Sequence, residues 1–184
     1  NAVDLVVVAG DVFDSAAPSA ACYPLLSQTL AALADTGARV LVPSGNHDSA
    51  ARPGFQSALL RAEITVVTDP VTVGTPVTLV DEHGPVHVYG IPYLEPMLQR
   101  DLYPGERFRG HGELLTRVMG EVDETRAARG RRSVVVSHCF AASGGAEDPD
   151  AGADRVWELT AGGRDGVPAE ISAGAEYAAP GHLH

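Results

Sequence analysis

Short apolar runs rich in Val and Leu recur along this chain, and most of them end in a polar motif. The runs at residues 3–9, 40–42 and 133–137 are too short for ordinary helices and rich in β-branched residues, which is typical of strands buried on both faces. A helical pattern at residues 20–34 separates the first two runs. The sequence therefore predicts a βαβ unit with parallel strands whose carboxyl ends share one edge of a sheet.

The spacing of apolar residues predicts the remaining elements. In the first helix Leu25, Leu26, Leu30 and Leu33 form an apolar face, and Gly37 ends it. Residues 64–67, 71–73, 77–80 and 86–91 predict a meander of short strands in a second sheet, and residues 55–61 a short helix. Residues 94–112 and 141–166 are expected to be loops. The apolar positions of a helix at residues 113–129 are Leu114, Leu115, Val118, Met119 and Val122. We expect a single α/β domain.

Four polar motifs carry the residues suited to chemistry: three follow these predicted strands, and the last follows the weaker apolar stretch at residues 177–180. They supply one carboxylate, one amide and four imidazoles, at Asp11, Asn46, His47, His138, His182 and His184. Loops at the carboxyl ends of strands are where α/β sheets bind ligands. Oxygen and nitrogen donors without a thiolate suit Mn, Fe or Zn in a hydrolytic site better than a structural zinc.

The residue types allow a role to be assigned to each donor. Two cations about 3.5–4 Å apart need a bridging carboxylate, and Asp11 is the best candidate. Asn46 would complete the shell of one ion without adding negative charge. His138 and His182 would complete that same site, and His184 would reach the other ion.

Three further residues accompany the expected ligands. His47 is better used as a proton donor to the leaving oxygen than as a ligand, because histidine side chains exchange protons near neutral pH. Asp14 and Asp48 are expected to orient the ligands.

Each of these residues also has a simpler structural interpretation. An Asp after a strand is more often a turn residue, and a lone strand-end His such as His138 is more often only hydrogen-bonded. Cys139 is expected to be a small buried apolar residue rather than a ligand. His83, His87 and His111 have no supporting pattern and are expected in loops or on the surface. The simple interpretations are individually plausible, but four motifs in order at strand ends favour a metal site.

The bulk composition restricts the classes of protein to consider. The net charge of −11 disfavours a broad nucleic-acid-binding face, although two divalent cations would offset it locally. No apolar run approaches the roughly 20 residues that a membrane span needs. Two cysteines, Cys22 and Cys139, are too few for a disulfide scaffold, so we expect a cytoplasmic protein.

The motifs together resemble those of the calcineurin-like metallophosphoesterase superfamily. Within it, the chain looks most similar to the SbcD family of bacterial DNA nucleases. The residues that carry this resemblance cover nearly the whole chain: Gly10-Asp11-Val12-Phe13-Asp14-Ser15-Ala16-Ala17-Pro18, Gly45-Asn46-His47-Asp48, Val88-Tyr89-Gly90-Ile91-Pro92-Tyr93, Ser137-His138 and Gly181-His182-Leu183-His184.

The resemblance implies a fold and a function. It implies a four-layer αββα sandwich and two divalent metal ions, most commonly Mn²⁺. Asp11 would bridge the metals, Asn46, His138 and His182 would bind one of them, His184 the other, and His47 would be catalytic. It also implies exonuclease and endonuclease action on DNA ends in repair, recombination and replication. The implied partner is an SMC-like ATPase, SbcC, and a homodimer within that complex is one expected arrangement.

The chain departs from that family in ways that leave alternatives open. The family's opening Asp-x-His strand motif and its capping region are absent, so we expect residues 1–184 to be part of a metallophosphoesterase nuclease domain, incomplete at both ends. Such a chain should hold one metal better than the other and show little activity alone. The alternatives are a metallophosphoesterase acting on a small phosphodiester or phosphoprotein, and a non-catalytic binding module or incomplete fragment.

Overall fold

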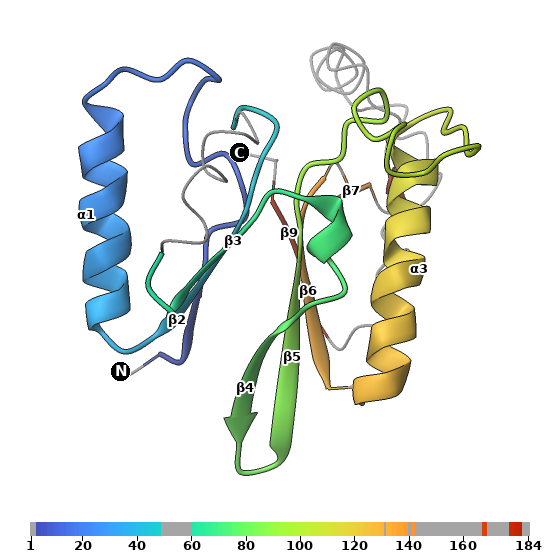
Figure 1. Cartoon of the computed structure of the whole chain (residues 1–184). Coiled ribbons are helices and arrows are strands. Elements are labelled where there is room, and N and C mark those ends of the chain that lie inside the picture. Colours follow the sequence, from blue (N-terminus) through green and yellow to red (C-terminus); the bar gives the residue numbers. More distant parts are fainter. Residues whose placement is uncertain are drawn as a thin grey trace, which may run out of the picture.

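The computed structural model describes residues 3–48, 60–130, 132–139, 141–142, 167–168 and 177–181. It shows the mixed α/β fold expected from the sequence (Figure 1). The elements are, in chain order, β1 (Leu5–Val7), α1 (Cys22–Asp35), β2 (Arg39–Pro43), β3 (Ile64–Val67), the 3₁₀ turn η2 (Pro70–Thr72), β4 (Val77–Asp81), β5 (Gly84–Ile91), α3 (His111–Arg129), β6 (Ser133–His138), β7 (Ala141–Ala142), β8 (Val167–Pro168) and β9 (Tyr177–Gly181).

Two main sheets lie between two helices. The first sheet has the strand order β1-β2-β3 and is parallel throughout. The second has the order β4-β5-β6-β9, in which only β4 and β5 are antiparallel. Helix α1 covers the first sheet and helix α3 covers the second, so the layers run helix, sheet, sheet, helix (Figure 1). This arrangement is compatible with the expected αββα sandwich.

Alternation of side chains along β2 explains why the first sheet is buried on both faces. Val40 and Val42 pack against Leu30 and Ala34 of α1. Leu41 points the other way and joins the core between the two sheets. Successive residues of a strand face opposite sides, so an unbroken apolar run is what a central strand between two layers requires.

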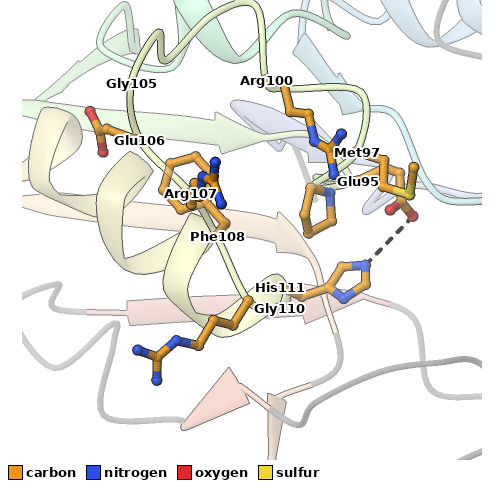
Figure 2. Close-up of a pocket in the computed structure, with 11 residues that line it drawn as sticks. Glu95, Met97, Arg100, Gly105, Glu106, Arg107, Phe108, Gly110 and His111 are labelled. Atoms are coloured by element: carbon orange, nitrogen blue, oxygen red, sulfur yellow. Dashed lines mark ion pairs between the residues drawn. The ribbon is translucent and has the colours of Figure 1, made fainter.

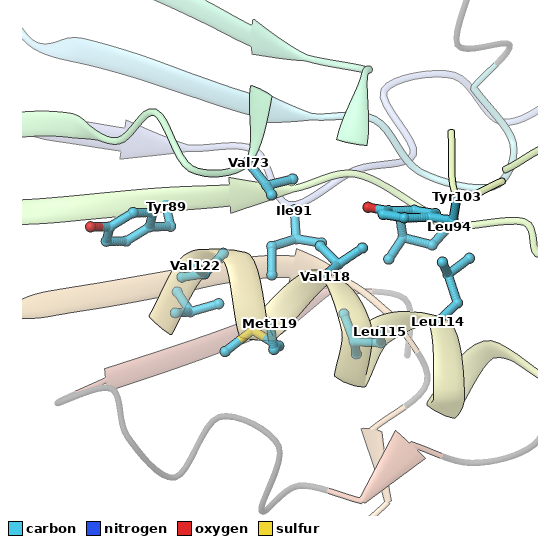
Figure 3. Close-up of a cluster of buried hydrophobic side chains, with 11 residues drawn as sticks. Val73, Tyr89, Ile91, Leu94, Tyr103, Leu114, Leu115, Val118, Met119 and Val122 are labelled. Atoms are coloured by element: carbon cyan, nitrogen blue, oxygen red, sulfur yellow. The ribbon is translucent and has the colours of Figure 1, made fainter. Parts of the chain in front are cut away.

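Strand β5 alternates in the same way in the second sheet. Val88 packs into the core between the sheets, whereas Tyr89 and Ile91 face α3 (Figure 3). The α3 residues expected on its apolar face are all buried: Leu114, Leu115, Val118, Met119 and Val122. The prediction of that helix face is confirmed, and burial of such side chains supplies about 1.5–3 kcal/mol each.

Two predictions about the meander are wrong. Residues 71–73 do not form a strand, because the Asp69 carboxylate accepts from the backbone N–H of Val71 (3.0 Å) and starts the turn η2. Strand β3 pairs in parallel with β2 and so belongs to the first sheet. A single-sequence pattern identifies a strand but does not identify its neighbour, since pairing is a tertiary choice.

Smaller differences occur at the first strand, the first helix and the third sheet. Strand β1 is shorter than expected and only partly buried, since within the described chain it is an edge strand. Leu25 is 65% exposed and does not belong to the buried face of α1. Ala141–Ala142 forms β7, which pairs with β8, where a loop was expected. The predictions for residues 55–59 and 143–166 lie outside the described residues. No helix in the described ranges is both long and apolar enough to cross a bilayer.

Candidate metal centre

The first motif turns through left-handed backbone directly after β1. Gly10 has φ +86° and Asp11 has φ +49°, the only non-glycine residue with positive φ in the described part of the chain. Aspartate tolerates this conformation better than most residues, but it remains uncommon. The turn directs the Asp11 carboxylate toward the second motif, where Oδ1 accepts from the backbone N–H of His47 (2.9 Å).

Three glycines allow the strand ends to approach closely. A Cβ at Gly10 would overlap the His138 ring, and one at Gly45 would overlap the carboxylate and backbone of Asp11. At Gly181 it would overlap the carbonyl of Ala9. The carboxyl ends of β1, β2, β6 and β9 therefore meet at one place. The expectation that the motif loops share one edge is confirmed for the described residues.

His138 lies at the centre of this meeting point with its side chain 1% exposed. Its Nδ1 is 2.7 Å from the Ala9 carbonyl oxygen. Because a carbonyl can only accept, Nδ1 carries the proton and donates it. Nε2 lies 2.9 Å from Oδ1 of Asn46 and 3.3 Å from Oδ2 of Asp11.

This geometry places three electron-pair donors against one another. In the neutral tautomer that Ala9 selects, the lone pair of Nε2 faces the two oxygens of Asn46 and Asp11. A cation among them, or a second proton on the ring, satisfies all three. Donation from Nδ1 to a backbone carbonyl is also how metal-binding histidines are commonly oriented. Asp11, Asn46 and His138 thus fit one cation by chemistry and position.

The described residues supply only part of a complete site. Within them, no group of three or more His, Cys, Asp and Glu side chains is placed to hold a metal ion. The three converging donors include an amide, that of Asn46, beside one carboxylate and one imidazole. His182 and His184 lie outside the described residues. Their neighbour Gly181 is paired in register with His138 across β6 and β9.

His47 is exposed, unlike His138, the other motif histidine among the described residues. Its Nδ1 is 2.9 Å from the carbonyl oxygen of Asp14, so Nδ1 donates and the ring orientation is fixed. Its backbone N–H is the group that binds Asp11. An oriented and accessible imidazole beside the converging donors supports its predicted use as a proton donor, which stays a prediction.

Asp48 ties the first and second motifs together. Its carboxylate, in a residue 6% exposed, accepts from the backbone N–H groups of Val12 (3.2 Å), Phe13 (3.1 Å) and Gly45 (2.8 Å). This is an orienting position of the kind proposed for it. Asp14 contributes its backbone carbonyl to His47 and is exposed, so any orienting effect acts through its backbone.

Sequence reasoning missed Tyr93, which lies against His138. Its backbone N–H donates to the Ser44 carbonyl (2.7 Å), which joins the two sheets beside the site. Its ring meets the His138 ring edge-on at 6.3 Å, and its hydroxyl is 3.0 Å from Nε2 of His111. Tyr93 comes shortly after a predicted strand end, but a single aromatic residue there gives no chemical signal.

The three histidines expected in loops or on the surface behave differently from one another. His83 is exposed at the β4–β5 turn, as expected. His87 is 6% exposed and its Nδ1 is 2.9 Å from the Thr78 hydroxyl, so that prediction is wrong. His111 begins α3 with its side chain 17% exposed, which also contradicts the expectation. Cys139 is partly buried, and burial raises the pKa of its thiol, as suits an apolar role.

Comparison with known proteins shows that the chain is similar to a bacterial nuclease subunit. The chain is 30% identical over 190 residues to the SbcD subunit of nuclease SbcCD from Bacillus subtilis (strain 168), aligned over 99% of this chain and 47% of that protein. The chain is distantly related to that nuclease subunit. It spans about half the length of this curated relative. No family model matches the chain.

Proposed function

We propose that this chain carries the metal-binding core of a phosphodiester hydrolase that acts as a DNA nuclease. The observation that carries the proposal is the convergence of Asp11, Asn46 and His138, with Nδ1 of His138 fixed by the Ala9 carbonyl. A cation at this point would satisfy the buried imidazole nitrogen and the two oxygens that face it. The distant relationship to a nuclease subunit supports the same conclusion.

In this proposal each motif residue has a separate task. Asp11 would be shared by two divalent ions, proposed to be Mn²⁺, and Asn46, His138 and His182 would hold one of them. His184 would hold the other. Such metals would supply electrostatic stabilisation of the attacked phosphoryl group and of the attacking and leaving oxygens. Asp48 holds the first and second motif loops together through its three hydrogen bonds to backbone N–H groups.

His47 is proposed to move the proton. Its Nδ1 is engaged by the Asp14 carbonyl, so Nε2 is the atom that would protonate the leaving oxygen. The exposure of the residue leaves that nitrogen accessible to a bound phosphodiester. General acid catalysis of this type contributes about 10²–10⁴-fold in rate.

The proposed substrate and partner rest on the distant relationship to a nuclease subunit and on the resemblance of the motifs. We propose DNA as the substrate and exonuclease or endonuclease cleavage at DNA ends, in repair and recombination. An SbcC-type ATPase would be the partner, within a cytoplasmic complex. The alternative substrates are a small phosphodiester and a phosphoprotein; the alternative role is a catalytically incomplete fragment.

The test compares substrates in the full-length protein. Cleavage of a blunt duplex DNA end and of bis(p-nitrophenyl) phosphate would be measured after EDTA treatment and after Mn²⁺ is restored, with Asn46→Ala as the matched inactive variant. Mn²⁺-dependent DNA cleavage that Asn46→Ala abolishes would support the nuclease. Hydrolysis of the small ester without DNA cleavage would favour the alternative enzyme. Mn²⁺-independent cleavage, or none of either substrate, would contradict the proposal.

A further inference from the structure

A second polar feature lies beside the candidate metal centre, in the long loop between β5 and α3. A pocket of about 870 Å³ is lined by this loop and the start of α3 (Figure 2). Its lining contains three arginines, Arg100, Arg107 and Arg109, against two glutamates, Glu95 and Glu106. In a chain with a net charge of −11, a pocket with more bases than acids is a local exception.

The two glutamates of the pocket already face other basic groups. Glu106 accepts from Nε of Arg117 (3.2 Å), and Glu95 lies 3.7 Å from Nε2 of His111. Arg109 lies 3.7 Å from Glu113 on α3. Arg100 and Arg107, by contrast, form no ion pair with any residue in the described ranges. Two arginines without carboxylate partners among the described residues therefore line this pocket.

The pocket wall is held in place by packing. Tyr103, 7% exposed, meets the Phe108 ring edge-on at 5.6 Å. The guanidinium of Arg117 lies over the Tyr103 ring at 4.8 Å. Burial of this tyrosine raises its pKa to about 12, so its hydroxyl stays neutral at physiological pH. The loop that presents Arg107 is thus anchored to α3 rather than free to collapse.

The floor of the pocket adds two further groups that favour an anion. Helix α3 spans 19 residues and begins after Gly110, where no side chain caps its first N–H groups, although Glu113 already places a carboxylate in the first turn and accepts from the backbone N–H of Arg109. The start of a helix favours negative charge. The buried Nδ1 of His111 has no hydrogen-bond partner within the described chain. These groups supplement the arginines, which carry the main argument.

The Tyr93 ring lies between the pocket and the candidate metal centre. Tyr93 contacts His138 of the metal centre on one side and His111 of the pocket on the other, with ring centroids 6.3 Å and 5.6 Å apart. A polynucleotide strand bound at the metal centre would carry further phosphates on either side of it, and Tyr93 and His111 connect that centre to the pocket that the arginines line. Arginine forks match phosphate oxygens in two parallel hydrogen bonds.

We propose that the pocket bearing Arg100 and Arg107 binds a phosphate group of the nucleic-acid strand next to the phosphodiester at the metal centre. This inference rests on the proposed nuclease function and adds a binding subsite to it. Because the subsite would contact a phosphate and no base, it would contribute affinity and strand position rather than sequence preference.

The test measures duplex DNA binding by the full-length protein in EDTA, so that cleavage plays no part. The double variant Arg100→Gln, Arg107→Gln should bind at least about tenfold more weakly at low salt. The magnitude of the slope of log affinity against log salt should fall by roughly 0.9, the value for one lost phosphate contact. Arg129→Gln is the matched control, since Arg129 is exposed at the far end of α3, and it should leave the slope unchanged.

Each outcome separates the two proposals. An unchanged affinity and slope in the double variant would overturn the phosphate subsite, and would leave an acidic protein surface as the ligand to consider. Equal losses in the double variant and in Arg129→Gln would also overturn it, because the effect would be general charge. A wild-type protein that binds DNA through these arginines but shows no metal-dependent cleavage would overturn the nuclease function alone.

Discussion

The polar side chains at the two ends of the second sheet have different kinds of partner. At the turn between β4 and β5, Asp81 forms two hydrogen bonds with the guanidinium of Arg132, both 2.7 Å long, in a partly exposed pair. At the opposite end, buried His138 presents one nitrogen to the oxygens of Asn46 and Asp11. We call these the hairpin end and the site end.

The difference lies in whether the charges balance. At the hairpin end a cation meets an anion, so the described groups satisfy one another. At the site end, an imidazole nitrogen and two oxygens meet at short range, and glycines remove the Cβ atoms that would keep them apart. A fold that needed only stability would not gain from such an arrangement. The site end is therefore interpreted as built for a positive ligand.

The sharpest contrast concerns the exposed histidine at each end. His47→Ala should lower DNA cleavage by at least about 10²-fold, because it removes the proposed proton donor, while Mn²⁺ binding changes little. His83→Ala, at the hairpin end, should leave cleavage unchanged. Single-turnover cleavage rates and metal titration measure the two properties. A loss of bound Mn²⁺ in His47→Ala would show that His47 is a ligand instead.

The second contrast concerns two glycines with positive φ. Gly10→Ala should reduce the free energy of unfolding by about 2–4 kcal/mol, because the new Cβ meets the His138 ring in addition to straining the backbone. Gly84→Ala at the hairpin end has open space around it, so only the backbone cost of about 1–2 kcal/mol applies. Urea denaturation of both variants measures the difference. If Gly10→Ala and Gly84→Ala lowered the free energy of unfolding equally, the close packing described at the site end would be contradicted.

The smallest contrast concerns two aspartates. Asp48→Asn should lower the free energy of unfolding by about 2–3 kcal/mol, because it weakens three hydrogen bonds to buried N–H groups. The hydrogen bonds from Arg132 and from the His83 backbone hold the pKa of Asp81 well below its ordinary value of 3.8.

The pH dependence at Asp81 follows from the sign of that shift. A lowered pKa in the folded state means that Asp81 stabilises the fold above about pH 4, and that this contribution is lost as the pH falls further. Asp81→Asn should therefore reduce stability slightly at neutral pH and flatten the acid limb of the stability profile. If Asp81→Asn lowered the free energy of unfolding as much as Asp48→Asn does, the proposed distinction between the two ends would be contradicted.

Much of the fold was predictable because local patterns decide it. The apolar face of α3 and the alternation in β2 follow from periodicity, and both agree with the structure. Val71 and Val73 suggest a strand, but residues 70–72 form a turn. The turn forms because the Asp69 carboxylate accepts a hydrogen bond from the Val71 backbone N–H. The wrong assignment of β3 to the second sheet has a different origin, because β3 pairs with β2 and strand pairing depends on the whole chain.

Part of the candidate site was predictable from the sequence, because its expected metal-binding residues stand in short polar motifs at strand ends. Asp11, Asn46, His47 and His138 were named from strand-end position, and the structure brings them to one edge. Tyr93 and the arginine pocket were not found. Their significance depends on a ring contact and on the absence of carboxylate partners among the described residues, and neither is visible in a linear sequence.

The central claim is that Asp11, Asn46 and His138 bind one cation, and equilibrium binding of Mn²⁺ tests it most directly. Electron paramagnetic resonance of free and bound Mn²⁺ would be measured for the wild type, Asn46→Ala, His138→Gln and the hairpin-end control His83→Gln, each checked for folding by circular dichroism. We expect Asn46→Ala and His138→Gln to weaken Mn²⁺ binding at least about tenfold, with His83→Gln unchanged. Wild-type affinity in folded Asn46→Ala and His138→Gln would contradict the claim.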